Sequence, residues 1–131
     1  MEWIQANDIE QRLNKLIFSL GFSHIEPARI FCFRSFGSRS KARARIWSLP
    51  RIWQKALGAR PAYCIEVLAE KFDKLTEEAK NKVLIHELLH IPRNFSGSLL
   101  SHKGRNRRID SRIVNKFYQT LKENGSLNSY L

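Results

Sequence analysis

The residues of this chain best suited to chemistry are two histidines four positions apart, with a glutamate directly after the first. They form the pattern His86-Glu87-Leu88-Leu89-His90 inside the stretch VLIHELLHIPRNF. On a helix, residues four apart lie one turn above each other, so both imidazoles project from the same face. Each can give one ring nitrogen to a shared zinc ion. The spacing therefore predicts a zinc site on a helix.

Glu87 lies one residue further round the same helix, beside such an ion but poorly aimed to bind it. That position suits a general base for a zinc-bound water. The metal would lower the pKa of the water and polarise the scissile carbonyl, and the glutamate would pass the proton to the leaving amine. The alternative is a buried helix whose histidines are only hydrogen-bonded. Burying a His-Glu pair beside a second His without a metal or partners is costly, which favours the metal.

A catalytic zinc needs a third protein ligand and an open coordination position. His102 is the leading candidate, with eleven residues between it and His90. Asp110 is the second candidate, and Glu66 and Glu70, which precede the motif, are weaker ones. The third ligand is therefore predicted to be His102, with Asp110 as the alternative.

Other reactive side chains have no settled role. Tyr63, Tyr118 and Arg105 could each stabilise an oxyanion, and nothing in the sequence chooses among them. Cys32 and Cys64 lie in strand-like apolar runs, and a cytosolic protein rarely keeps disulfides, so we expect reduced thiols. A disulfide or a metal role for these cysteines stays open.

The elements that must position these residues follow from apolar periodicity and from turn signals. We expect, in chain order, a helix from Asn7 or Asp8 to Gly21, strands over 28–36 and 43–49, a short helix over 51–57 ended by Gly58, a strand over 61–72, a helix capped by Thr76 that ends near Ile91 because of Pro92, a helix over 108–122, and a frayed tail. The order α-β-β-α-β-α-α predicts one α+β domain, residues 1–131, with a small three-stranded sheet packed on helices.

The charge of the chain is strongly positive and uneven. The 131 residues carry a formal net charge of +11. No acidic residue occurs between Pro27 and Ile65, where nine Lys and Arg residues fall, and a second basic cluster spans 103–112. Such asymmetry indicates a polyanionic partner or an acidic substrate, or simply a basic solvated surface. No run is long enough to span a bilayer and no signal peptide is evident, so we expect a cytoplasmic protein.

The stretches YCIEVLAEKFDKLTEEAKNKVLIHELLHIP and FSGSLLSHKG carry a family resemblance. Over Ala62 to Val114, about half the chain, the sequence resembles the minimal zincin-type metallopeptidases of archaea and phages. It is more distantly similar to SprT-like proteases, in which a third histidine follows the motif helix and precedes a glycine. The segment SHKG matches that pattern, so the resemblance implies His102 as third ligand. It also implies an edge strand beside the active-site helix, here Tyr63 to Leu68, to which an extended peptide could add.

Departures from the larger zincin groups limit this resemblance. The third histidine comes too early for the metzincin pattern HExxHxxGxxH, and no glutamate-bearing second helix typical of gluzincins is evident. The motif nevertheless predicts a zinc metallopeptidase acting on peptide or protein substrates, with His86, His90 and His102 as ligands and Glu87 as general base.

Three alternatives remain open at this stage. The first is a nucleic-acid-binding protein with a structural zinc, using the same histidines plus Cys64 or Cys32, with Trp47 and Trp53 as stacking groups among the arginines. The second combines both activities, as a SprT-like protease acting on DNA-bound proteins. The third is an inactive zincin kept as an interaction module. The sequence does not reveal the oligomeric state.

Overall fold

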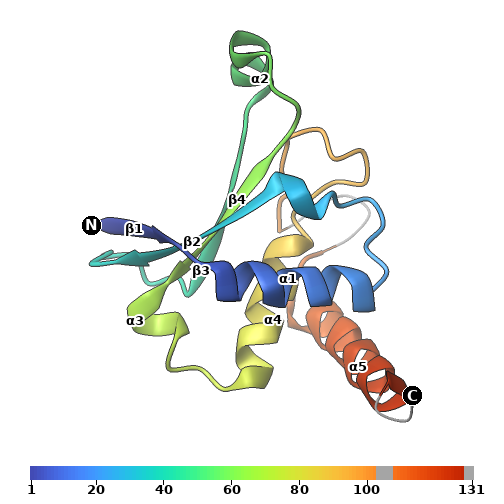
Figure 1. The fold of residues 1–131 in the computed structure, drawn as a ribbon. Helices are drawn as coiled ribbons and strands as arrows, with labels where there is room; N and C mark the ends of the chain where they lie inside the picture. The colour runs from blue at the N-terminus through green and yellow to red at the C-terminus, as the bar shows by residue number, and fades with distance from the viewer. Residues whose placement is uncertain (103–107, 129–131) are drawn as a thin grey trace.

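The computed structural model describes residues 1–102 and 108–128 (Figure 1). Its elements, in chain order, are β1 (Glu2–Gln5), α1 (Asn7–Ser19), the 3-10 helix η1 (Pro27–Arg29), β2 (Ile30–Phe36), β3 (Ala44–Ser48), α2 (Arg51–Leu57), β4 (Tyr63–Leu68), α3 (Ala69–Phe72), α4 (Glu77–Leu88) and α5 (Ser111–Asn128). The mixed α and β composition is as predicted. Two parts of the prediction were wrong: the segment expected as one strand over 61–72 ends at Leu68 and continues as α3, and α5 extends through most of the expected frayed tail.

The sheet has four strands, not the three that were predicted, in the order β1-β2-β4-β3. The additional strand is β1, which pairs antiparallel with β2 so that Trp3 lies opposite Ser35. Strands β2 and β4 are parallel, with Cys32 opposite Ile65, whereas β3 is antiparallel to β4, with Ile46 opposite Ile65. A parallel neighbour requires a crossover connection, and here β3 and α2 lie within that connection.

The predicted edge strand also needs correction. Tyr63 to Leu68 form β4, which lies inside the sheet between β2 and β3. The strand at the edge next to the motif helix is β3 instead, and β3 contacts α4 directly. An inner strand has no unpaired main-chain groups to offer a peptide, so only β3 could accept one on this side of the sheet.

The hydrophobic core lies between one face of the sheet and three helices. Ile65 and Val67 of β4 and Leu84 and Ile85 of α4 are all completely buried. Helices α1, α4 and α5 contact one another and gather on one side of the strands (Figure 1). Helix α2 lies in the connection between β3 and β4 and projects away from these three helices (Figure 1). On the opposite face of the sheet, Trp3 is 54% and Trp47 is 50% exposed, so within the described residues no helix covers them. This two-layer arrangement fixes α4, which carries the motif, against the sheet.

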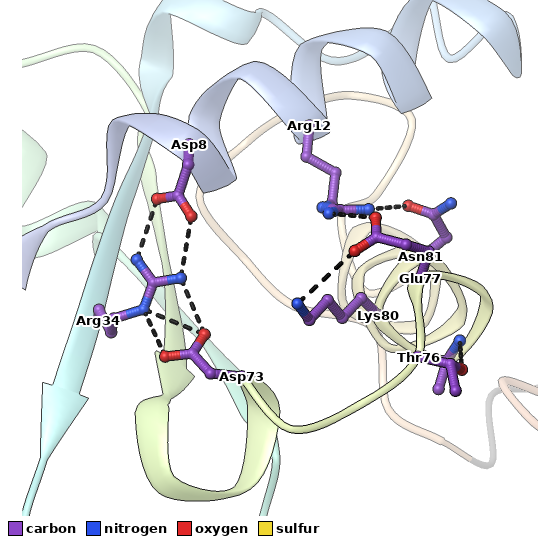
Figure 2. Close-up of polar contacts among 9 residues, drawn as sticks. Asp8, Arg12, Arg34, Asp73, Thr76, Glu77, Lys80 and Asn81 are labelled. Atoms are coloured by element: carbon purple, nitrogen blue, oxygen red, sulfur yellow. Dashed lines mark hydrogen bonds and ion pairs between the residues drawn. The ribbon is translucent and has the colours of Figure 1, made fainter.

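Polar contacts tie the start of α1 and the start of α4 to the rest of the fold (Figure 2). The Arg34 guanidinium on β2 donates to Asp8 at 3.0 Å and to Asp73 at 2.9 to 3.2 Å, and this pairing lowers the pKa of Asp8. Asn7 or Asp8 was expected to cap α1, but Ala6 is the N-cap residue and Asn7 is the first residue of the helix. The Asp8 carboxylate is used in the ion pair with Arg34. Thr76 caps α4 as predicted, accepting from the Ala79 amide at 3.2 Å.

Candidate metal centre

Helix α4 and the turn that follows it carry the two motif histidines. Leu84, Ile85 and Leu88 are buried in the core, which leaves His86 half-buried on the flank that faces away from it. The helix ends at Leu88, earlier than predicted, and the His90 amide then bonds the Glu87 carbonyl at 3.1 Å in a tighter, three-residue turn. The two rings still lie close, with centroids 5.2 Å apart.

His102 is brought to these two histidines by main-chain contacts of the preceding loop. The Leu100 amide donates to the His90 carbonyl at 2.7 Å, and the His90 Nδ1 lies 2.6 Å from the Leu100 carbonyl oxygen. Because a carbonyl oxygen only accepts, Nδ1 of His90 must carry a proton, which leaves Nε2 with its lone pair. A hydrogen bond from one ring nitrogen to a carbonyl is the usual way to orient a metal-binding histidine.

The three imidazoles converge. One ring nitrogen from each of His86, His90 and His102 lies within 4.8 Å of the others, and Nε2 of His86 is 3.1 Å from Nε2 of His102. Two nitrogens bound tetrahedrally to zinc, each about 2.0–2.1 Å from the ion, would be roughly 3.3 Å apart. The spacing therefore fits a shared ion. In the described residues this is the one group of His, Cys, Asp and Glu side chains found close enough to hold a metal.

The electrostatics of the cluster favour neutral imidazoles. Burial, together with the neighbouring His90 and His102, lowers the pKa of His86 to about 4. Burial likewise lowers the pKa of His90. At neutral pH, His86 and His90 are therefore uncharged. Neutral imidazole is the form that gives a lone pair to a metal ion.

Glu87 lies beside this cluster with its carboxyl group largely buried. Its side chain comes within 4.0 Å of the His86 Nε2. Burial raises its pKa to about 8, because a carboxylate loses hydration in the apolar surroundings of α4. The carboxyl group next to the histidines is thus one whose proton affinity has been moved into the neutral range.

The cluster opens into a cleft of about 710 Å³. The cleft is bounded by the segment that leads into and begins β3, by α4 and by the start of α5. Its lining residues include His86, Glu87, His90 and His102 together with Lys41, Arg43, Lys82, Asp110 and Val114. The histidines and Glu87 are therefore reachable from solvent, as a catalytic centre requires.

The family comparison agrees with this geometry. A family model described as "Putative phage metallopeptidase" matches residues 1–129. The chain belongs to this family. Comparison with curated proteins and with solved structures gave no significant match. Among residues 1–102 and 108–128, no helix is both long and apolar enough to cross a membrane.

Other predicted ligands do not join the histidines of this phage metallopeptidase family member. The Asp110 carboxylate lines the cleft, but it accepts from the Ile113 amide at 3.2 Å and so caps α5. Glu66 is buried on the opposite face of the sheet, held by Arg45 at 2.8 Å. The Glu70 carboxylate accepts from the Gly37 amide, beyond the end of β2.

The two cysteines are free thiols, as expected. Cys64 lies opposite Trp47 in the register of β4 and β3, and Cys32 is buried in the core. Burial raises the pKa of Cys32 to about 12, which makes it a poor source of thiolate. Neither thiol belongs to the histidine group.

The three candidates for oxyanion stabilisation have different outcomes. The Tyr63 hydroxyl accepts from the Gly97 amide at 2.9 Å and donates to the Ser98 carbonyl at 2.8 Å, so it holds the loop that leads to His102. Tyr118 is half-buried on α5, and Arg105 lies outside the described residues. Sequence reasoning missed the role of Tyr63, because no local pattern marks contacts between a strand and a loop more than thirty residues away.

Proposed function

We propose that this chain is a zinc-dependent peptidase in which His86, His90 and His102 hold the metal and Glu87 is the general base. The observation that carries the proposal is the convergence of three imidazole nitrogens in an open cleft. Nitrogen donors in a group of three suit zinc and leave a position for a reactant. A bound zinc ion would act as a Lewis acid toward water and the peptide carbonyl.

Glu87 supplies the proton transfers in this proposal. Its carboxylate lies beside the histidines and borders the cleft. The pKa of about 8 describes the protein without a cation, and a nearby divalent ion would lower it and restore a carboxylate at neutral pH. Glu87 would accept a proton from the attacking water and then give it to the nitrogen of the leaving amine. Atoms and charge balance because one water molecule is consumed for each peptide bond.

The substrate in this proposal is an extended peptide that adds to the β3 edge. The Arg43 carbonyl accepts from the Leu68 amide and the Leu49 amide donates to the Ala62 carbonyl, so alternate residues of β3 bond β4. Main-chain groups of the residues between them, such as Ala44 and Ile46, then point away from β4. A peptide paired with these groups would run along the cleft whatever its side chains are.

The first experiment measures metal content and hydrolysis together. Wild-type protein purified without added metal is analysed for zinc and tested on an unfolded protein substrate, beside His102→Ala and Glu87→Gln. We expect about one zinc per chain in the wild type and in Glu87→Gln, and less in His102→Ala. Hydrolysis should fall by two or more orders of magnitude in Glu87→Gln, on the order of what general-base catalysis contributes.

His24→Ala is the matched control, because His24 is the one histidine of the chain outside the cluster. It should retain both zinc and activity. Full hydrolysis by zinc-loaded Glu87→Gln would reject Glu87 as the base. Zinc content unaffected by His102→Ala would reject His102 as a ligand, and absence of zinc after it is added back would reject the metal centre.

A further inference from the structure

The sheet face opposite the helices carries an unexplained group of aromatic side chains. The register places Phe31 and Trp47 on either side of Cys64. Two residues further along the same strands, Phe33 lies beside Glu66. Trp3, Phe33 and Trp47 line a shared hollow of about 440 Å³. We call Trp3, Phe31, Phe33 and Trp47 the aromatic face.

The aromatic face is open to solvent. Trp3 is 54% exposed, Trp47 is 50% exposed and Phe31 is 42% exposed. Alternate residues of the same strands, such as Cys32 and Ile65, are buried under the helices. Solvent-exposed rings grouped over several strands of a sheet indicate an interaction surface, because scattered single residues are the usual pattern.

The charges around the aromatic face are positive. The Arg29 guanidinium lies over the Phe31 ring, 5.8 Å from its centroid. It donates to the Arg60 carbonyl at 2.8 Å and the Pro61 carbonyl at 3.2 Å, which are neutral acceptors, and within residues 1–102 and 108–128 it forms no ion pair.

The one carboxylate that lines the hollow is already neutralised. Glu66 is 1% exposed and accepts from both Arg45 and the Trp47 indole at 2.8 Å. It therefore adds little repulsion toward an anion. Arg45 also lies over the Trp47 ring at 5.2 Å, so its guanidinium fixes the orientation of that ring.

We propose that the aromatic face binds single-stranded nucleic acid, with bases stacked on the rings and a phosphate drawn to Arg29. Stacking on aromatic side chains together with a positive surface is how proteins hold single strands without sequence preference. The net charge of +11, and the lack of acidic residues between Pro27 and Ile65, provide the charge complementarity. A duplex keeps its bases stacked on one another, so unpaired strands should bind better.

This site is separate from the histidine cluster. Helix α4 packs on the other face of the sheet, and none of the four aromatic residues lines the cleft. The proposal does not depend on zinc or on hydrolysis, and it can be tested on the full chain.

The test is fluorescence anisotropy of a labelled 20-nucleotide oligothymidylate titrated with wild-type protein, Trp3→Ala, Trp47→Ala and Trp53→Ala. Trp53 is 55% exposed on α2 and does not line the hollow, and so provides the matched control. We expect each of the first two substitutions to weaken binding by about tenfold or more, from the loss of one stacked base. Trp53→Ala should bind as the wild type does. Trp47→Ala also removes a hydrogen bond to the buried Glu66 and could unfold the protein. In that case the result with Trp3→Ala decides the test.

The charge contribution is tested by the salt dependence of the same binding. Arg29→Gln should reduce the slope of log affinity against log salt concentration by about 0.7, the amount expected for one phosphate contact on a single strand. Lys15→Gln, an exposed cation on α1, should leave the slope unchanged. Equal slopes for these two variants would argue against Arg29 as a phosphate contact.

Three results would overturn the proposal. The first is wild-type affinity in folded Trp3→Ala and Trp47→Ala. The second is an equal loss of affinity in Trp53→Ala, which would place the contact elsewhere. The third is no binding of the oligonucleotide at low salt together with a dimer in gel filtration that Trp3→Ala converts to monomer, which would show that a second copy of the chain covers this face.

Discussion

Replacing Tyr63 with Phe tests whether a strand residue holds the loop that delivers His102. The hydroxyl group accepts from the Gly97 amide at 2.9 Å and donates to the Ser98 carbonyl at 2.8 Å, and Tyr63 is 1% exposed. Phenylalanine keeps the ring and its edge-on contact with Phe95, whose centroid is 5.1 Å away. The substitution therefore removes two hydrogen bonds and little else.

The loss of stability depends on the two main-chain groups that lose their hydrogen-bond partner. Gly97 is buried, so its amide loses its partner without access to water, at a cost of about 1–3 kcal/mol. Ser98 is exposed, so its carbonyl can bond water and costs little more. We expect the free energy of unfolding to fall by about 2 kcal/mol, measured by urea denaturation, with a melting temperature lower by about 5–10 °C.

The same substitution should weaken zinc binding, because the loop from Gly97 to His102 loses one of its anchors. We expect about a tenfold loss of affinity in competition with a chromogenic chelator, in line with other residues that orient metal ligands. Tyr118→Phe is the control, because Tyr118 lies on α5, outside the loop. Unchanged stability and unchanged zinc affinity in Tyr63→Phe would refute the reasoning and leave the His90–Leu100 contacts as the anchor of the loop.

Three further outcomes are expected. Gly97→Ala should destabilise the fold by about 2–4 kcal/mol in urea denaturation, since Gly97 has a φ of +92° and a Cβ there would lie 2.7 Å from the Leu49 carbonyl oxygen. Burial raises the pKa of Glu66, but its bonds to Arg45 and Trp47 outweigh burial and the pKa falls from 4.5 to about 2. The stability that Glu66 contributes is therefore full above the unfolded pKa and is lost as pH falls through this range. Glu66→Gln should therefore show a melting temperature less dependent on pH between about 5 and 2 than the wild type. Zinc at a hundredfold excess over its dissociation constant should raise the free energy of unfolding by about 2.7 kcal/mol, an effect that EDTA reverses and that His86→Ala lacks.

Helices α1, α2, α4 and α5 and three of the strands were predictable because their signals are local. The Thr76 cap and the apolar residues that follow it mark α4, and Gly58 at a φ of +62° ends α2 as expected. Strand β1 was missed because it has four residues, all exposed, and so shows no alternation of buried and exposed positions. Its pairing depends on β2, which lies about thirty residues further along the chain.

Strand order was not predictable from local patterns. Tyr63 to Leu68 form an inner strand because β2 pairs with it on one side and β3 on the other. Residues Ile65 to Leu68 are all buried, and a strand buried on both faces is usually a continuous apolar run in the sequence. Glu66 broke that pattern in the sequence, and only its partners Arg45 and Trp47 explain how a carboxylate can be buried there.

The candidate site combines a local rule with a long-range one. The spacing of His86 and His90 follows from helix geometry, but the approach of His102 depends on where α4 stops. In a continued helix, the His90 carbonyl would accept from the amide four residues on. Pro92 disfavours helix at the residue before it, and α4 ends at Leu88, so this carbonyl accepts instead from Leu100 at 2.7 Å. The end of α4 before Pro92 thus leaves the His90 carbonyl free to bond Leu100, and this bond holds the loop that carries His102.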